Sequence, residues 1–366
     1  MTSNEFGAQV DRTPQTWHMH LRSTFGTAFV VLLLALGLGG AATPQPTSAR
    51  VATTGGLSTP GVSAVPRLVT GRSAWVSVSV ARLWQSPSSP WRVDAPALES
   101  PVRFRAWLAA MSLSQRRALD LRSDTEALLG DRVVVVQLKP RWAKVVVPSQ
   151  PSQKDSRGYP GWVPRRQLTA LAPPHAALVA TVTHRTAWLR ADDPDAQRMT
   201  EISFGTRLPV LSRASGYVRV AVPGGAVRRL ATGAVVVHAP GTPAIAASRA
   251  GLVGTAKSFL GVQYLWGGLS GFGLDCSGLT WLDHRVHGIR IPRDALPQSR
   301  HGRRVSTRLP GDLLFYASSG RVHHVSMYLG AGQMIHAPRT GQPVKIVAFS
   351  APPLRSEYAG ARRYVS

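Results

Sequence analysis

The sequence predicts a protein of three folded domains, in which two small antiparallel β barrels precede an α+β domain. Its 366 residues are enough for two or three domains. Between residues 73 and 238, short runs of β-branched and aromatic residues are separated by turn residues, which is typical of small barrels. From residue 248 to 366, helical and strand-like patterns follow one another, and this segment contains Cys276, the only cysteine of the chain.

The N-terminal region has the pattern of an export signal. Residues 24–42 form an apolar run that is preceded by basic residues and followed by small ones, so residues 1–42 are predicted to be a secretory signal peptide. A chain that started at Met19 would have a signal of more ordinary length. An uncleaved membrane anchor is the alternative, although the strongly apolar core at 28–38 is short for a span of about 20 residues. We therefore expect a secreted or cell-envelope protein, bound to the membrane only if this segment remains. Residues 43–72, rich in Thr, Pro, Gly and Ala, are predicted to be a flexible linker.

The chain is strongly basic. It contains 43 Lys and Arg residues against 18 Asp and Glu residues, a formal net charge of +25. Such a surface attracts polyanions. The arginines are scattered singly and in pairs, without the basic run interleaved with aromatic residues that a nucleic-acid site requires. We therefore expect no nucleic-acid partner, and anionic cell-wall polymers remain as candidate partners.

Two all-β domains are predicted, over residues 73–170 and 176–238. In the first, an insertion at 101–122 has helical spacing. The segments “DTEALLGDRV”, “RWAKV” and “GYPGWVP” of the first domain and “FGTRLPVL” of the second resemble bacterial SH3-like domains. This resemblance implies domains that bind cell-wall peptides or shape an adjoining active site. Generic β modules that act as spacers are the alternative, because a fold does not fix a function.

The surroundings of Cys276 predict a nucleophile. A glycine-rich segment at 266–275 precedes it, and the apolar residues after it have helical spacing, so Cys276 is expected in the first turn of a helix. A helix N-terminus stabilises a thiolate. The alternative is a buried cysteine that acts as a small hydrophobic residue, and the polar neighbours Asp275 and Ser277 argue against burial. With one cysteine, no internal disulfide is available.

A base for this thiol is predicted in residues 322–338, which have the pattern of a β hairpin with its turn near Ala331. His324 and His336 are then diagonal neighbours on one face, while His323 points to the opposite face. We assign His324 as the base and His336 as its orienting partner.

A zinc site is the competing use of these side chains. Its ligands would be Cys276, His324, His336 and Asp312, but their spacing matches no CxxC or HExxH pattern. We therefore expect no metal and no cofactor.

Six short motifs of the third domain carry a family resemblance. They are “YLWGG” (264–268), “DCSGLT” (275–280), “IPRDALPQ” (291–298), “LPGDLLFY” (309–316), “HHVSMYLG” (323–330) and “MIHAP” (334–338). In this order they resemble the NlpC-type cell-wall peptidases, which are papain-like cysteine enzymes. With the SH3-like domains ahead, the chain looks like the subgroup that cuts between D-glutamate and a diamino acid in peptidoglycan stem peptides.

The resemblance implies a role for each residue of the predicted triad. Cys276 would be the nucleophile, His324 the base and His336 the third member. The reaction would be thiolate attack on a stem-peptide amide, followed by hydrolysis of a thioester.

The resemblance also implies three further site residues. Tyr264 would assist the oxyanion, which agrees with the need for donors where negative charge develops. Asp275 and Ser277 would hold the amino end of the substrate. Asp275 next to a thiol opposes thiolate formation unless it faces a cation, and its alternative role is to cap the helix.

Two other functions stay open at this point. One is a cell-wall binding protein with an inactive peptidase domain, and the other is an amidase or acyltransferase on the same fold. One departure also leaves the substrate requirement open. Where related first SH3-like domains carry an aromatic residue before Gly130, this chain has Leu128 and Leu129.

Overall fold

The computed structural model describes residues 66–365. The predicted signal peptide at 1–42 and most of the predicted linker at 43–72 lie outside these residues. No helix within the described part is long and apolar enough to cross a membrane.

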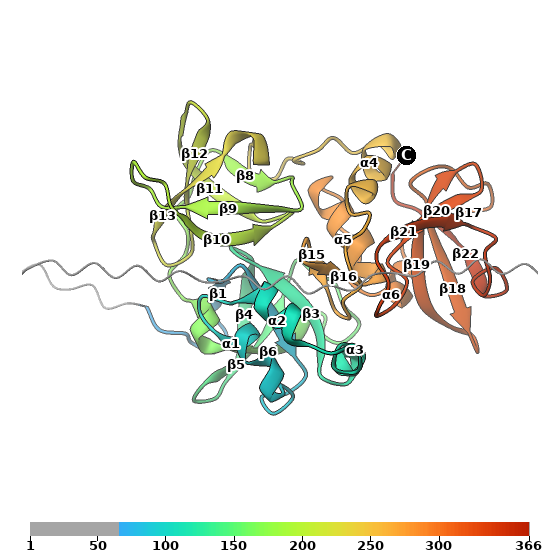
Figure 1. Ribbon diagram of the computed structural model, residues 1–366, viewed down its shortest axis with the longest axis horizontal. Coiled ribbons are helices and arrows are strands. Elements are labelled where there is room, and N and C mark those ends of the chain that lie inside the picture. Colours follow the sequence, from blue (N-terminus) through green and yellow to red (C-terminus); the bar gives the residue numbers. More distant parts are fainter. Residues whose placement is uncertain (1–65, 366) are drawn as a thin grey trace, which may run out of the picture. The chain divides into compact units, whose positions relative to one another are not determined.

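The first β domain is a seven-stranded antiparallel sheet with the strand order β3-β2-β6-β5-β4-β1-β7 (Figure 1). Alternate valines and alanines of these strands form its core. Within the described residues no ladder joins β3 to β7, so the sheet is open rather than the closed barrel that we predicted. The strands are β1 (Ser73–Val76), β2 (Val80–Trp84), β3 (Ser123–Leu128), β4 (Arg132–Leu138), β5 (Trp142–Val147), β6 (Tyr159–Pro164) and β7 (Leu168–Thr169), with a 3-10 turn η3 (Arg165–Gln167) before β7.

A helical insertion separates β2 from β3, as the spacing at 101–122 predicted. The buried Trp107 anchors it, because its indole Nε1 donates to Asp94 over 2.8 Å. Ser112 begins the third helix with a capping box to Gln115. The insertion consists of η1 (Arg92–Asp94), α1 (Ala95–Leu98), α2 (Phe104–Ala110), α3 (Leu113–Arg117) and η2 (Ala118–Leu121).

The second β domain repeats this architecture with the strand order β10-β9-β13-β12-β11-β8-β14, and it is also open among the described residues. Its core consists of apolar residues from most of these strands. Strands β10 and β13 are rich in polar residues, so no apolar strand pattern marks them in the sequence. The elements are β8 (Val179–Val182), β9 (Thr186–Arg190), β10 (Arg198–Ser203), β11 (Arg207–Ala214), β12 (Tyr217–Ala221), β13 (Val227–Ala231), η4 (Thr232–Ala234) and β14 (Val235–His238).

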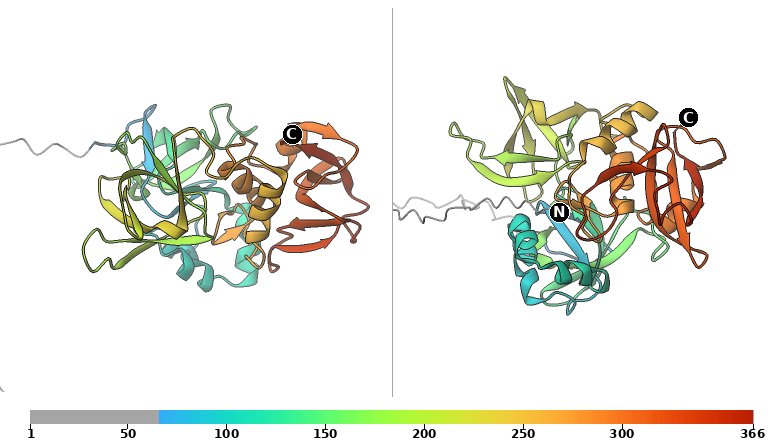
Figure 2. Two further views of the ribbon diagram at one scale, coloured as in Figure 1. Left: turned by 90° about the horizontal axis from the view of Figure 1, so that it is seen from above. Right: turned by 45° about the vertical axis from the view of Figure 1, so that its right-hand side comes forward.

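The third domain packs helices against a six-stranded sheet with the order β17-β22-β18-β19-β20-β21. Helices α4, α5 and α6 contact β19, a central strand of this sheet (Figures 1 and 2). Its helices are α4 (Arg249–Ser258), α5 (Cys276–Val286) and α6 (Ala295–Arg300). Its strands are β15 (Leu269–Ser270), β16 (Gly273–Leu274), β17 (Arg303–Val305), β18 (Leu313–Ser318), β19 (Arg321–Gly330), β20 (Gln333–His336), β21 (Lys345–Ala348) and β22 (Tyr358–Arg363).

The hairpin β19–β20 has the predicted turn. Ala331 and Gly332 both have positive φ, at 48° and 70°, and connect the two strands. Met327 pairs with Ile335 across the ladder. This register places His336 one diagonal step from His324 on the same face of the sheet.

Candidate active site

Cys276 is the first residue of α5, as predicted. Asp275 caps this helix, because its side chain accepts from the Gly278 backbone N–H over 2.6 Å. The loop before the helix comes so close that a Cβ on Gly278 would lie 2.0 Å from the Gly268 carbonyl oxygen. A larger residue at 278 would therefore displace the helix start that positions the thiol.

The environment of the thiol differs from the expected one. Cys276 is only 8% exposed, and Asp275 and Ser277 are buried beside it, so polar neighbours did not prevent burial. Burial and the Asp275 carboxylate raise the pKa of Cys276 to about 12. The free protein therefore holds a thiol at neutral pH. The helix N-terminus does not by itself generate a thiolate.

His324 and His336 form the predicted pair. His324 Nε2 and His336 Nδ1 are 2.9 Å apart, and the two rings meet edge to face. Burial, with the neighbouring His336 as a smaller cause, lowers the pKa of His324 to about 3. Burial and the charge of Lys345 lower the pKa of His336 to about 4. Both imidazoles are therefore neutral at pH 7, as a base and its orienting partner must be.

The predicted orientation of His323 is wrong. The pairing of β18 with β19 shifts register between Tyr316 and Ala317, and the resulting bulge interrupts the alternation of side chains at His323. The His323 ring centroid lies 6.5 Å from that of His324, and its Nε2 is 3.2 Å from a Glu357 oxygen. His323 therefore lies at the edge of the site rather than on the opposite face.

Cys276, His324 and Tyr264 meet at one cavity of about 680 Å³. Tyr264 is buried, and burial together with the nearby Cys276 raises the pKa of its hydroxyl well above the usual value. Its hydroxyl is therefore a neutral hydrogen-bond donor beside the thiol, which is what the predicted oxyanion role requires.

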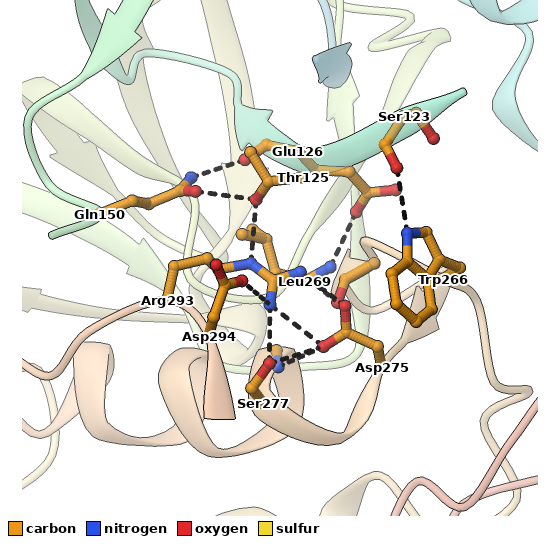
Figure 3. A network of polar contacts seen from close by, with 12 residues as sticks. Ser123, Thr125, Glu126, Gln150, Trp266, Leu269, Asp275, Ser277, Arg293 and Asp294 are labelled. Atoms are coloured by element: carbon orange, nitrogen blue, oxygen red, sulfur yellow. Dashed lines mark hydrogen bonds and ion pairs between the residues drawn. The ribbon is translucent and has the colours of Figure 1, made fainter. Parts of the chain in front are cut away.

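Asp275 and Ser277 are occupied by a partner from within the chain. Arg293 donates to both Asp275 carboxylate oxygens, over 3.1 and 2.8 Å, and to Ser277 Oγ over 3.0 Å (Figure 3). Our expectation that these two residues hold the amino end of the substrate therefore does not fit the geometry. Asp275 has its cation already.

Arg293 is a site residue that the sequence analysis did not single out. It is fully buried, although it follows directly on a proline in an unremarkable loop. A signal was available, since a carboxylate beside a nucleophilic thiol requires a compensating cation. The sequence alone did not say which of 43 Lys and Arg residues supplies it.

The first β domain supports the site through a buried polar network. Thr125 Oγ1 accepts from Arg293 Nε over 2.9 Å (Figure 3). Glu126 pairs with Arg82 over 2.9 Å and accepts the Leu269 backbone N–H over 3.0 Å. Arg82 in turn donates to the carbonyl oxygen of Trp266 over 2.7 Å. These contacts fix the glycine-rich loop that precedes Cys276.

The same domain lines the cavity directly. Tyr159 is the aromatic residue with which this domain lines the cavity. Leu128 and Leu129, which stand where related domains carry an aromatic residue, are instead buried in hydrophobic cores. Asp124 lines the cavity too, and it pairs with Lys154 over 2.8 Å. The first β domain is therefore part of the site and not a spacer.

Asp312, the fourth candidate ligand of the competing zinc site, is bonded to an arginine and to a backbone N–H instead. Asp312 accepts twice from Arg363, each over 2.7 Å, and caps the turn at Leu309. Within residues 66–365, no group of three or more His, Cys, Asp or Glu side chains is placed to hold a metal ion.

Comparison with known proteins places this geometry in a family. The model of the NlpC/P60 family matches residues 261–363. A Bacillus cereus protein named gamma-D-glutamyl-L-lysine dipeptidyl-peptidase is 41% identical over 304 residues, which cover 80% of this chain and 91% of that protein. The chain belongs to the NlpC/P60 family.

Further similarities extend over the β domains of this NlpC/P60 chain. The model of the YKFC SH3b2 domain matches residues 182–238. A Bacillus subtilis protein of the same dipeptidyl-peptidase name is 36% identical over 79% of this chain and 97% of its own length. The crystal structure of an NlpC/P60 family protein from Bacillus cereus has a TM-score of 0.77 and 38% identity, and covers 81% of this chain and all of that one.

These similarities confirm the predicted family and fold class. This NlpC/P60 protein is a cysteine peptidase in which β-rich SH3-like domains precede the catalytic domain.

Proposed function

We propose that this chain is an exported cysteine endopeptidase that hydrolyses the bond between D-glutamate and the diamino acid in peptidoglycan stem peptides. The observation that carries the proposal is the meeting of Cys276 and the His324–His336 pair at a cavity whose wall includes the first β domain. The relatives of 41% and 36% identity, named for the γ-D-glutamyl-L-lysine bond, support this bond type. The apolar pattern of residues 24–42 supports export.

The neutral thiol and imidazole define the first step. Because His324 Nε2 is bonded to His336, its Nδ1 accepts the proton of Cys276 as the sulfur attacks the carbonyl carbon. The Cys276 backbone N–H, free at the helix start, and the Tyr264 hydroxyl donate to the oxygen that becomes negative. His324 then gives its proton to the leaving nitrogen, and a thioester remains. A water molecule, deprotonated by His324, hydrolyses the thioester and restores the thiol.

The cavity also contains a carboxylate for the free amino group of the peptide. Asp275 accepts two hydrogen bonds from Arg293, and Asp124 pairs with Lys154, whereas Asp294 lies 4.0 Å from Arg293 Nη1 without a hydrogen bond from it. Burial and the charge of Asp275 raise the pKa of Asp294, and Tyr159 donates to it over 3.4 Å. A substrate ammonium would pair with this half-buried acid, whose side chain is 38% exposed toward the cavity. We assign Asp294, in place of Asp275, to the amino terminus of the L-alanine that begins a released stem peptide.

Digestion of synthetic L-Ala-γ-D-Glu-diamino acid peptides, followed by mass spectrometry, tests the function. The free peptide should release the L-Ala-γ-D-Glu dipeptide, and Cys276→Ala should abolish the release. N-acetylation should reduce kcat/KM by roughly 10- to 100-fold, because a hydrogen bond between charged groups contributes about 1.5–3 kcal/mol. Asp294→Asn should remove this preference, whereas Asp275→Asn should retain it. Equal cleavage of free and acetylated peptides would overturn the assignment of Asp294. Release of a different product would indicate an amidase or another endopeptidase.

A further inference from the structure

In the protonation state that the reaction requires, one ring nitrogen of the His324–His336 pair has no hydrogen-bond partner. This inference rests on the proposed function. For His324 to accept a proton on Nδ1, its Nε2 must carry a hydrogen and donate it to His336 Nδ1. His336 Nδ1 is then an acceptor, so the hydrogen of the neutral His336 ring lies on Nε2. The low pKa of His336 is consistent with this neutral ring at pH 7.

This Nε2–H has nothing to bond to. Among the residues that the structure describes, His336 Nε2 is buried and has no hydrogen-bond partner. A buried donor without an acceptor destabilises a fold, because its hydration is lost and not replaced. Orphaned donors of this kind are rare in native proteins and indicate an acceptor that the chain itself does not supply.

His336 lines a second cavity, of about 460 Å³, which is basic. Lys345 is directly opposite His336 in the β20–β21 ladder, and Arg339 follows the end of β20. The acid in the lining, Glu357, has its own partner in His323 at 3.2 Å. His336 and two cations, against one acid, therefore line this cavity, which favours an anionic ligand.

The second cavity adjoins the first on the side of the leaving group. The two cavities share His323, His324 and Pro338 in their linings. His324 gives its proton to the leaving nitrogen, so the leaving residue begins next to this imidazole. The anionic groups of a leaving diamino acid are its carboxylates.

We propose that the cavity lined by His336, Lys345 and Arg339 binds a carboxylate of the leaving diamino acid, which accepts from His336 Nε2–H and pairs with Lys345. The substrate then completes the histidine pair and fixes its tautomer. Two carboxylates have this chemistry, namely the α-carboxylate of any leaving residue and the side-chain carboxylate of meso-diaminopimelate. L-Lysine carries the same side-chain ammonium but has a hydrogen in place of this side-chain carboxylate.

Three peptides distinguish the α-carboxylate from the side-chain carboxylate as the bound group. They share the L-Ala-γ-D-Glu part and end in meso-diaminopimelate, in its side-chain carboxamide or in its α-carboxamide. We expect at least a tenfold loss of kcat/KM for one carboxamide, and the carboxamide that shows it identifies the bound group. Equal kcat/KM for all three peptides would overturn the carboxylate site and leave the proposed function standing, whereas the absence of cleavage of every peptide would overturn both.

Two variants locate the site. Lys345→Gln should bring the acid-to-amide ratio of kcat/KM close to one, because the charge that distinguishes the two peptides is lost. Lys257→Gln removes the same charge from the exposed end of α4, outside the lining of this cavity, and should keep the wild-type ratio. The ratio is insensitive to a general loss of folding. An unchanged ratio in Lys345→Gln would contradict the proposal.

Discussion

At the scale of single residues, the electrostatics of Cys276 depend on a carboxylate and its cation. Asp275 caps the helix that begins at Cys276, and its negative charge raises the pKa of the thiol. Arg293 offsets this charge with two hydrogen bonds to the Asp275 carboxylate. The free protein therefore keeps its nucleophile protonated until a substrate brings the carbonyl and the base together.

The first prediction concerns the reactivity of this thiol. Since the pKa of Cys276 is about 12, its alkylation rate by iodoacetamide should rise about tenfold per pH unit from pH 7 to 10. Asp275→Asn should accelerate alkylation at pH 8, because Arg293 is then uncompensated and lowers the pKa of the thiol. Asparagine also caps helices, so α5 should persist. The alkylation rate is measured by intact-protein mass spectrometry, with Cys276→Ala as the blank. A rate that is constant from pH 5 to 9 would indicate a thiolate–imidazolium pair instead.

Residue-level patterns predicted part of this site. A lone cysteine before a helical pattern and two histidines on one predicted face were visible in the sequence, and the structure brings them together. Arg293 was not predicted, since Thr125 and Asp275, which hold it, lie 168 and 18 residues away. His323 was placed on the wrong face because a β bulge arises from the pairing of strands, which no single-strand pattern contains.

At the scale of elements, strand β3 supports the glycine-rich loop of the catalytic domain. Glu126 of β3 accepts from the backbone of Leu269 and pairs with the buried Arg82 of β2. Burial is the largest cause that raises the pKa of Glu126 and lowers that of Arg82, so the pair is stable only while both partners are present.

The second prediction therefore concerns Glu126→Gln. Removal of one charge leaves Arg82 buried and unpaired, which should lower the free energy of unfolding by about 3–5 kcal/mol. It should also lower kcat, because the loop before Cys276 loses its anchor. Urea unfolding and peptide kinetics measure the two effects. Glu99→Gln, in an exposed pair with Arg103, is the matched control and should change neither. If Arg82→Met rescues the loss, the charge pair is the cause, whereas a Glu126→Gln variant as stable as the control would show that the network is dispensable.

Element-level patterns predicted most helices and strands. Short runs of β-branched and aromatic residues between 73 and 170 predicted strands of the first β domain, and helical spacing predicted the insertion between β2 and β3. Strand β13, “VRRLA”, has no apolar strand pattern, because two of its five residues are arginines and only Leu230 is buried. Its pairing with β12 determines its structure. The pattern of single strands also does not determine whether a sheet closes into a barrel, and both sheets are open among the described residues.

At the scale of the whole molecule, buried neutral histidines couple folding to pH. Burial lowers the pKa of His284 to about 4, as it does for the histidine pair of the active site. A histidine with a lowered pKa in the folded state contributes stability above its unfolded pKa, near 6.5. This contribution is lost as the pH falls through the folded value.

The third prediction follows for His284→Asn. At pH 7 the variant should be less stable than the wild type, because the hydrogen bond from His284 Nδ1 to the Thr280 carbonyl and the packing of the ring are lost. Between about pH 6.5 and 4 the wild type should lose roughly 3 kcal/mol more than the variant, at about 1.4 kcal/mol per pH unit of pKa difference. Thermal or urea unfolding across this range measures the difference. A constant difference between the two proteins would show that His284 does not titrate with folding. Because Asp283 lies 3.5 Å from His284 Nδ1 and burial raises its pKa, the two proteins are compared in an Asp283→Asn background, which removes the titration of this acid.

The contacts of Arg82, Glu126, Thr125 and Arg293 also limit how such a chain can evolve. An SH3-like domain is commonly regarded as a cassette that can be exchanged between proteins. Here each domain contains its own buried ion pair, Arg82–Glu126 in the β domain and Arg293–Asp275 in the peptidase domain, and hydrogen bonds between the domains connect the two pairs. An exchange by recombination would bring together domains that have not been selected for each other, and would leave buried hydrogen-bonding groups without partners at the join. The first β domain and the peptidase domain are therefore expected to be inherited together, and a functional chimera must transfer both.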